Sequence, residues 1–261
     1  MKHEELILNL KQLNLAELAR SYTELARLAE KSKLTFEQFL AAAVKLEVDH
    51  RLQKRVARMI NAAKIPKDRH IATYDFSCRS GITAQEVNRL AEGNFVRKGD
   101  NIVFYGTFGI GKSHLAMGLT RALCEKGFRC LFKSTQDLIT ELVTAQQTLK
   151  LTALFRRLDR YDLIVCDELG FTSTSKEGGE LFFRFLSQRY ERKSVLITTN
   201  LTYSAWDKVF TDPLATAAAV DRFIHQCETF NIQGPSWRAE AAAARRRQKQ
   251  TEQPEQPAPT H

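Results

Sequence analysis

A short glycine-rich stretch places the strongest constraint on this chain of 261 residues. GTFGIGKS, residues 106–113, follows the apolar run NIVFY at 101–105 and precedes a helical pattern from Lys112 to about Glu125. It fits the spacing G-x-x-x-x-G-K-[ST], in which the glycines let the backbone curl until several amides point inward. The helix that follows adds the positive end of its dipole. The stretch therefore predicts a phosphate-binding loop between a strand and a helix.

Each position of this loop has an expected contact with a nucleotide. Lys112 is expected to neutralise charge on the β- and γ-phosphates, and the Ser113 hydroxyl to bind Mg²⁺. A glycine turn with an incidental lysine is the alternative, but it gives no reason for the flanking strand and helix. The sequence therefore predicts ATP and Mg²⁺ as ligands, with a nucleotide site formed by Gly106, Thr107, Phe108, Gly109, Ile110, Gly111, Lys112, Ser113 and His114.

A second motif, YDLIVCDE at residues 161–168, is an apolar strand that ends in two acids. We expect the first, Asp167, to hold the Mg²⁺ shell from the C-terminal edge of the strand. The second, Glu168, is expected to polarise a water for attack on the γ-phosphate. A kinase that passes phosphate to a bound substrate does not need this second acid. The pair therefore favours an ATPase over a small-molecule phosphotransferase.

A third apolar strand, SVLITTN at residues 194–200, also ends in a polar residue. Asn200 is a candidate for orienting the attacking water from the strand beside Asp167, although asparagine is also common where a strand passes into a turn. Helical patterns separate the expected strands, and this alternation predicts an α/β fold with a parallel sheet covered on both faces. The strands are expected at 101–105, 129–133, 163–166 and 195–198.

The first seventy residues carry helical patterns and almost no strand signal. Leucines recur three and four residues apart from Leu6 to Leu28, as amphipathic helices require. Thr35-Phe-Glu-Gln38 fits a capping box, which starts a helix expected to run to about Lys64. The apolar stripe of this helix is Leu40, Val44, Val48, Leu52, Val56, Met59 and Ile60.

Cations gather on the same helix. Residues 44–70 hold eight Lys or Arg and three Asp or Glu, in a chain whose net charge is +9. Such a run is common on a solvated helix face, but it also suits contact with a polyanion, above all nucleic acid. The second interpretation predicts a ridge that contacts DNA phosphates, formed by Arg51, Lys54, Arg55 and Arg58.

Composition along the chain predicts its division into domains. Pro66 and the polar stretch 67–70 read as a linker between a small all-helical domain, residues 1–70, and an α/β domain, residues 71–250. Residues 251–261 form a Pro- and Gln-rich tail that cannot build a core. No stretch reaches the roughly 20 apolar residues of a membrane-spanning helix, and the N-terminus lacks a signal-peptide profile. We expect a cytoplasmic protein without a membrane partner.

Taken together, these stretches resemble the IstB branch of the DnaC-like group of AAA+ ATPases, the ATP-dependent helpers of transposases encoded by bacterial insertion sequences. The resemblance covers nearly the whole chain, and its segments follow the family order. One departure is Gly106-Thr-Phe-Gly109, where many relatives carry Gly-Pro-Pro-Gly. The segments that carry the resemblance are GTFGIGKSHLA, YDLIVCDELGF, ITTNL, AVDRFIH and GPSWR.

The resemblance implies roles that the residues alone do not. It implies a P-loop AAA+ core, with Asn200 as the first sensor residue. Arg222 would be the arginine finger that reaches a neighbouring subunit's site, and Arg238 would contact the nucleotide in its own subunit. Trans-acting arginines of this kind couple hydrolysis to assembly. The N-terminal helical domain is expected to hold double-stranded DNA.

The sequence thus predicts an ATP-dependent, DNA-binding transposition helper. ATP between subunits would favour a homo-oligomer on target duplex DNA, bound mainly through phosphates and therefore largely without sequence preference. The assembly would recruit and stimulate a partner transposase, and hydrolysis would drive its disassembly. The alternative is a DnaC-like loader of the replicative helicase, built on the same ATPase core.

Overall fold

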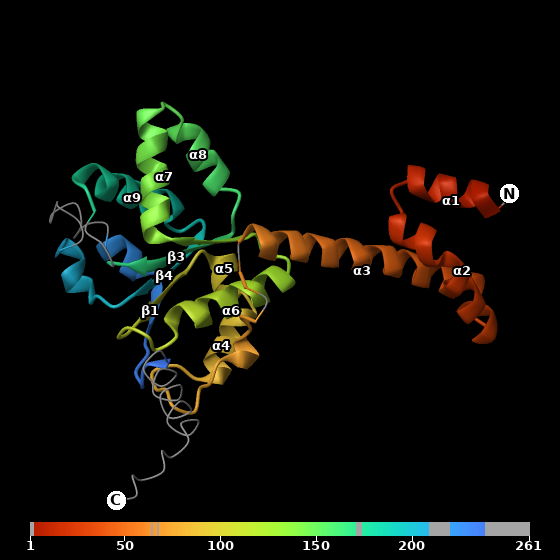
Figure 1. Cartoon of the computed structure of the whole chain (residues 1–261), viewed down its shortest axis with the longest axis horizontal. Coiled ribbons are helices and arrows are strands. Elements are labelled where there is room, and N and C mark those ends of the chain that lie inside the picture. The colour runs from red at the N-terminus through yellow and green to blue at the C-terminus, as the bar shows by residue number, and fades with distance from the viewer. Residues whose placement is uncertain (1–2, 64, 67, 171–173, 209–219, 238–261) are drawn as a thin grey trace, which may run out of the picture. The chain divides into compact units, whose positions relative to one another are not determined.

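The structure is a computed structural model that describes residues 3–63, 65–66, 68–170, 174–208 and 220–237 (Figure 1). It divides into two compact units, an N-terminal unit of residues 1–59 and a C-terminal unit of residues 60–261. The predicted boundary near residue 70 and the predicted extent of the α/β domain stay predictions, and the expected tail at 251–261 lies outside the described residues. None of the described helices is both long and apolar enough to cross a membrane.

The N-terminal unit consists of helices. They are α1 (His3–Gln12), α2 (Ala16–Lys31) and the first part of α3 (Phe36–Ala62). The predicted capping box is present at the start of α3, because the Thr35 amide donates to the Gln38 side chain at 2.9 Å and the Gln38 amide donates to the Thr35 hydroxyl at 3.2 Å. The local signals of the sequence therefore set the start of the longest helix.

A buried carboxylate joins two of these helices. Glu47 of α3 is 4% exposed, and its Oε2 accepts the backbone N–H groups of Glu17 and Leu18, at 2.9 and 3.1 Å. Leu15, the N-cap of α2, supplies no side-chain cap of its own. Glu47 therefore satisfies the free amides at the start of α2 from another helix, as an N-cap side chain does locally.

The predicted apolar stripe of α3 is exposed from Leu40 to Leu52, whereas the neighbouring face of the helix, which carries Glu47, is buried. Ala43 and Glu47 face the rest of the N-terminal unit and are buried. The stripe residues one position further on are exposed, and the accessible fraction of Val48 is 56%. The exposed apolar side chains on α3 are Phe36, Leu40, Val44, Val48 and Leu52.

The C-terminal unit contains a five-stranded sheet in the order β2-β3-β4-β1-β5, and each pair in it is parallel. This confirms the predicted α/β class. The four predicted strands are present with ends shifted by a few residues. The edge strand β5 was not predicted from the sequence. The strands are β1 (Asn101–Tyr105), β2 (Cys130–Ser134), β3 (Leu163–Leu169), β4 (Ser194–Thr199) and β5 (Cys227–Asn231).

Helices cover both faces of this sheet (Figure 1). On one face lies α6 (Lys112–Glu125), with α4 (Ala84–Ala91) and α5 (Asn94–Lys98) beside it; on the other lie α7 (Thr135–Gln147), α8 (Leu151–Leu158) and α9 (Lys176–Arg189). The central strands are buried almost throughout, as parallel strands covered on two faces must be. Two 3₁₀ turns, η1 (Ile71–Thr73) and η2 (Tyr203–Lys208), complete the described elements.

The stretch that the sequence indicated as a linker is packed against α6. The buried Arg121 of α6 donates to the carbonyl of Pro66 at 2.8 Å and to that of Arg69 at 3.0 Å. A Cβ on Gly118 would meet the Ile71 amide at 2.9 Å, so the two backbones lie close together. The segment before η1 therefore belongs to the wall of the C-terminal unit and reaches the site described next.

Candidate functional site

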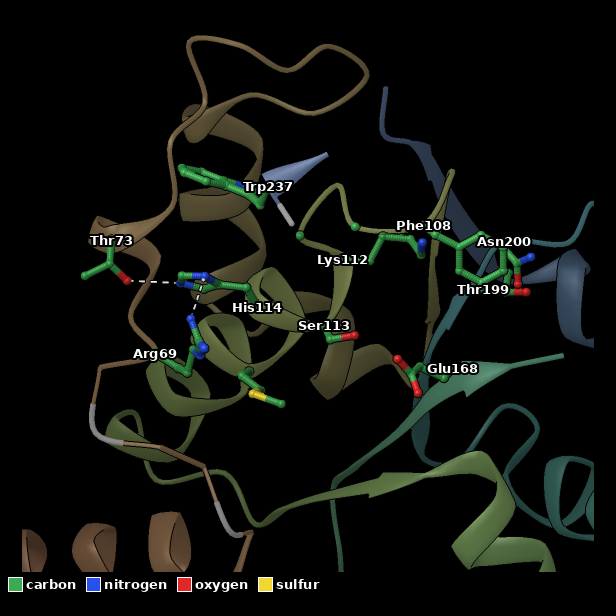
Figure 2. A pocket seen from close by; sticks show the side chains of 13 residues that line it. Arg69, Thr73, Phe108, Lys112, Ser113, His114, Glu168, Thr199, Asn200 and Trp237 are labelled. Atoms are coloured by element: carbon green, nitrogen blue, oxygen red, sulfur yellow. Dashed lines mark hydrogen bonds between the residues drawn. The ribbon is translucent and has the colours of Figure 1, made fainter. Parts of the chain in front are cut away.

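A pocket of about 480 Å³ lies in the C-terminal unit where the loop after β1 meets the C-terminal ends of β3 and β4. This is the edge at which parallel α/β sheets bind ligands. The pocket brings together many of the predicted site residues (Figure 2). Its lining consists of Arg69, Thr73, Phe108, Gly109, Gly111, Lys112, Ser113, His114, Met117, Glu168, Thr199, Asn200 and Trp237.

The shape of the loop depends on its glycines. Gly106, Gly109 and Gly111 have φ angles of +152°, +78° and +96°, a region that side chains rarely adopt. A Cβ on Gly106 would meet the Ile232 carbonyl oxygen at 2.2 Å, and one on Gly109 would meet the Ser236 hydroxyl at 2.2 Å. The loop therefore needs glycine both for its curl and for close packing against the segment that follows β5.

Lys112 and Ser113 begin α6 at the mouth of this loop. The Lys112 ammonium donates to the carbonyls of Gly106 and Thr107, each at 2.8 Å, so it lies across the loop opening. The Ser113 hydroxyl is close enough to the Asp167 carboxylate to lower the pKa of that carboxyl against the rise that burial causes. In Figure 2 the side chains of Ser113 and Glu168 point toward one another. The loop and the end of β3 thus bring a cation, a hydroxyl and two acids to one place.

The two acids occupy a break in the sheet. Regular pairing of β3 with β4 ends at Cys166 and resumes at Leu169, opposite Thr199. Two residues of β3 therefore stand opposite one residue of β4, as in a β-bulge. Glu168 has φ +58°, a left-handed conformation that costs a non-glycine residue on the order of 1 kcal/mol. The bulge lets consecutive acids serve one site, although strand side chains normally alternate between faces.

The environments of the two acids differ. Asp167 is 8% exposed, whereas Glu168 is exposed and lines the pocket. Burial raises the pKa of the Asp167 carboxyl, and the hydroxyls of Thr198 and Ser113 oppose that rise. A hydroxyl and a carboxylate are oxygen ligands of the kind that Mg²⁺ prefers, with phosphate oxygens completing its shell. The residues present therefore fit the predicted Mg·ATP: the glycine loop offers amides to phosphates, and Ser113 and Asp167 offer oxygens to the ion.

Arg69 and Thr73 form one wall of the pocket, and neither was predicted from the sequence, whereas His114 was. His114 bridges α6 to the segment around η1, because Arg69 Nη1 lies 3.2 Å from its Nδ1 and the Thr73 hydroxyl lies 3.0 Å from its Nε2 (Figure 2). Burial and the Arg69 cation lower the pKa of His114, so the ring is neutral at pH 7. The partners are 45 and 41 residues apart in the sequence, and no spacing rule connects them.

A second part of that wall is aromatic. The Arg79 guanidinium lies 4.1 Å from the centre of the Trp237 ring, and its Nε donates to the Ile110 carbonyl at 3.1 Å. The Tyr74 hydroxyl donates to the same carbonyl at 3.3 Å. Ile110 is fully buried. The stack therefore anchors the middle of the phosphate loop to segments far away in the sequence.

The remaining predicted residues lie elsewhere. Asn200 lines the pocket beside Thr199, while Arg222 is an exposed residue in a helical part of the chain and is not part of the lining. Arg238 lies outside the described residues. In the N-terminal unit, Arg51 donates to Glu47 at 3.1 Å and to the Asn14 carbonyl at 2.7 Å, so this member of the predicted DNA ridge also holds the unit together. Lys54, Arg55 and Arg58 are exposed on α3.

Comparisons with known proteins agree with this architecture. The model of the family described as IstB-like ATP binding protein matches residues 8–245. An insertion sequence ATP-binding protein from Sinorhizobium fredii is 32% identical over 239 residues, which are 91% of this chain and 80% of that protein. The ATP-binding protein of insertion sequence IS21 from Pseudomonas aeruginosa is 32% identical over 234 residues, 90% of this chain and 88% of that protein.

Solved structures support the same fold. The DnaC helicase loader superposes with a TM-score of 0.55 at 22% identity, over 64% of this chain and 98% of that one. DnaI gives a TM-score of 0.54 at 18% identity, over 68% of this chain and 94% of that one. At these identities the likeness shows the fold alone. The family match, the AAA+ fold and the phosphate-loop pocket lead to one conclusion: the chain belongs to the IstB-like ATP-binding family and is a P-loop ATPase.

Proposed function

We propose that this ATPase is a transposition helper, which assembles on target duplex DNA when it binds ATP and then recruits and stimulates a partner transposase. The observation that carries the proposal is the relationship to ATP-binding proteins of insertion sequences over about nine-tenths of the chain. Hydrolysis takes the assembly apart. We propose a cytoplasmic location for the protein, because the target duplex DNA of the proposed reaction lies there.

The pocket supports the proposed role of hydrolysis. Lys112 neutralises phosphate charge, Ser113 and Asp167 hold Mg²⁺, and the exposed Glu168 polarises the attacking water. Asn200 lies in the same lining and orients that water.

We propose that Arg222 reaches into the ATP site of a neighbouring subunit. This exposed arginine is not among the residues that line its own subunit's pocket. An arginine supplied by a neighbour would stabilise charge on the transferring phosphoryl group only in the assembled state. ATP would then hold subunits together, and hydrolysis would weaken the contact. The proposed role of Arg238, contact with the nucleotide of its own subunit, is carried by the family resemblance alone.

Mass photometry and electron microscopy test the assembly step. The purified chain is incubated with Mg·ATP or Mg·ADP, with and without a duplex, and large particles are expected only with ATP, most abundantly on DNA. Lys112→Ala should stay small under all conditions. Lys126→Ala is the matched control, since this surface lysine after α6 pairs with Glu92. A parent chain that stays monomeric in saturating Mg·ATP with DNA would contradict the proposal.

A mixing experiment tests the shared site. Arg222→Ala lacks the finger and Lys112→Ala lacks the phosphate contact, so each alone should hydrolyse ATP poorly. A mixture forms some interfaces with one intact loop and one intact finger, and part of the activity should return. No gain on mixing, with both variants folded, would place the function of Arg222 within its own subunit.

Salt dependence tests the DNA ridge. Each phosphate contact contributes about −0.9 to the slope of log affinity against log salt concentration. Lys54→Ala combined with Arg55→Ala should therefore flatten the slope by about 1.8 for each bound subunit. Lys31→Ala with Lys33→Ala removes the same charge elsewhere in the N-terminal unit and serves as the control. Equal slopes for both pairs would exclude a specific role of the ridge.

The likeness to the DnaC helicase loader leaves a second candidate, a loader of the replicative helicase. Copurification separates the two: the proposed helper should retain a partner transposase, whereas a loader should retain the replicative helicase instead. A transposase reading frame directly upstream would further support the helper.

A further inference from the structure

A single hydroxyl in β4 contacts both acids of the site. The Thr198 hydroxyl donates to Asp167 Oδ1 at 2.5 Å and accepts the backbone N–H of Glu168 at 2.9 Å. Thr198 is fully buried, and it is the residue of β4 that stands opposite the two-residue bulge of β3. The bond to Asp167 has the short length expected of a hydroxyl that donates to a carboxylate.

At the bulge, the Thr198 hydroxyl replaces a backbone hydrogen bond of the sheet. In a regular parallel pair, the N–H of Glu168 would point to a backbone carbonyl of β4. Here pairing is interrupted, and the Thr198 hydroxyl is the acceptor instead. The left-handed backbone of Glu168 persists only if its surroundings hold it. A buried side chain bonded to its amide is such a restraint.

The same hydroxyl fixes the other acid. Asp167 Oδ1 accepts from the Thr198 hydroxyl, and the Asp167 backbone carbonyl accepts the Thr135 hydroxyl at 2.9 Å. Since the hydroxyl has one proton and accepts through its oxygen, it can serve both acids at once. The Thr198 hydroxyl oxygen therefore links the Asp167 side chain to the Glu168 backbone and fixes the position of one acid relative to the other.

We propose that Thr198 is a positioning residue for ATP hydrolysis: through one buried hydroxyl it holds Asp167 in the orientation that binds Mg²⁺ and holds Glu168 in the turn that aims its carboxylate at the γ-phosphate. Thr198 is fully buried and is not among the residues that line the pocket, so it acts through the two acids. The inference rests on the proposed roles of Asp167 and Glu168 in hydrolysis, and it does not depend on DNA or a transposase.

Thr198→Val tests the proposal, because it keeps the branched shape and removes the hydroxyl. We expect the kcat for ATP hydrolysis to fall about 10- to 100-fold, the range found when partners of metal ligands are removed. The KM for ATP should change far less, since the loop that holds the phosphates is untouched. Thr198→Ser keeps the hydroxyl and should stay near the parent kcat.

A binding measurement supplies a readout other than turnover. Titration of a non-hydrolysable fluorescent ATP analogue at several Mg²⁺ concentrations reports how strongly the ion supports binding. Thr198→Val should need several-fold more Mg²⁺ for the same gain in affinity, and Thr198→Ser should not. Thr120→Val is the matched control: this buried threonine of α6 donates its hydroxyl to the Ala116 carbonyl of the same helix, and loss of that hydroxyl should leave both readouts unchanged.

A second pair of variants keeps the test decisive if Thr198→Val does not fold. Thr198→Ser and Thr198→Ala both lack the methyl group and differ in the hydroxyl alone. The proposal expects the alanine variant to hydrolyse ATP at least about tenfold more slowly than the serine variant. Equal rates for these two, or parent-like kcat and Mg²⁺ dependence for Thr198→Val, would overturn it.

Discussion

The N-terminal and C-terminal units are stabilised in different ways. In the described part of the N-terminal unit the buried side chains are three alanines and Glu47, whereas the C-terminal unit buries large side chains such as Trp206, Phe104 and Phe182 completely. A unit of about sixty residues buries little surface and has a small margin of stability. Polar contacts and helix caps therefore matter more in the first unit, and apolar packing matters more in the second.

Glu168→Gln should have the largest effect, a loss of ATP hydrolysis. It sharpens the comparison because it should change the C-terminal unit alone. Glutamine binds a water but cannot take its proton, so kcat should fall about 10³-fold, within the usual range for a general base. ATP binding and the stability of the N-terminal unit should stay as in the parent. Single-turnover hydrolysis and nucleotide titration measure this, and unchanged turnover would assign the base to another residue.

Phe182→Ala tests the apolar core. This fully buried side chain of α9 packs against Phe185 with ring centres 6.0 Å apart. Its truncation leaves a cavity, and we expect the free energy of unfolding of the C-terminal unit to fall by about 3–5 kcal/mol. Urea denaturation followed by circular dichroism measures this. A loss below about 1 kcal/mol would mean that the core of this unit is no tighter than that of the N-terminal unit.

Glu47→Ala should have an intermediate effect and act on the N-terminal unit alone. It removes the acceptor of two α2 amides, which costs about 1–2 kcal/mol of the free energy of unfolding. Glu47→Gln keeps an acceptor and should cost less. Limited proteolysis within residues 3–59 and hydrogen exchange of the Glu17 and Leu18 amides report this loss separately from the C-terminal unit.

The same carboxylate predicts a dependence on pH. Burial alone would raise the pKa of Glu47, but hydrogen bonds from the Leu18 amide, Arg51 and the Glu17 amide bring it below its ordinary value of 4.5. A carboxyl with a lowered folded-state pKa stabilises above its unfolded pKa and loses this contribution as pH falls through the folded value. Protection of the α2 amides should therefore decline below about pH 4.5 in the parent and show no such step in Glu47→Gln.

Val48→Ser should have the smallest effect. The side chain is exposed on α3, so the change should alter the free energy of unfolding by less than about 0.5 kcal/mol. Thermal melting at two protein concentrations is the measurement. A loss above about 1.5 kcal/mol would break the comparison, because it would mean that the apolar stripe is buried in solution and stabilises this unit as a core does.

Much of the fold and of the candidate site could be predicted from the sequence because the signals are local. The phosphate loop, the acids at the end of β3 and the capping box of α3 are short motifs whose geometry follows from neighbouring residues. Strand β5 was missed because CETFN, at the edge of the sheet, is mostly polar and lacks the apolar run of a central strand.

The contacts that were missed join segments distant in sequence. Trp237 meets Arg79 across more than 150 residues, and Arg69 meets His114 across 45. Nothing in the spacing of these residues relates them. Thr198 carried a weak signal, since a hydroxyl inside an apolar strand needs a buried partner, but the sequence could not identify that partner as the pair of acids.

At Glu168 the left-handed backbone favours a residue such as glycine, whereas the proposed reaction requires a carboxylate. Glycine or asparagine would adopt this conformation more readily, and either would relieve local strain. Neither could serve as a proton acceptor for water. The proposed role of Glu168 as the proton acceptor accounts for a carboxylate at a position where glycine or asparagine would be more stable, so we expect a substitution that stabilises this turn to lower ATP hydrolysis.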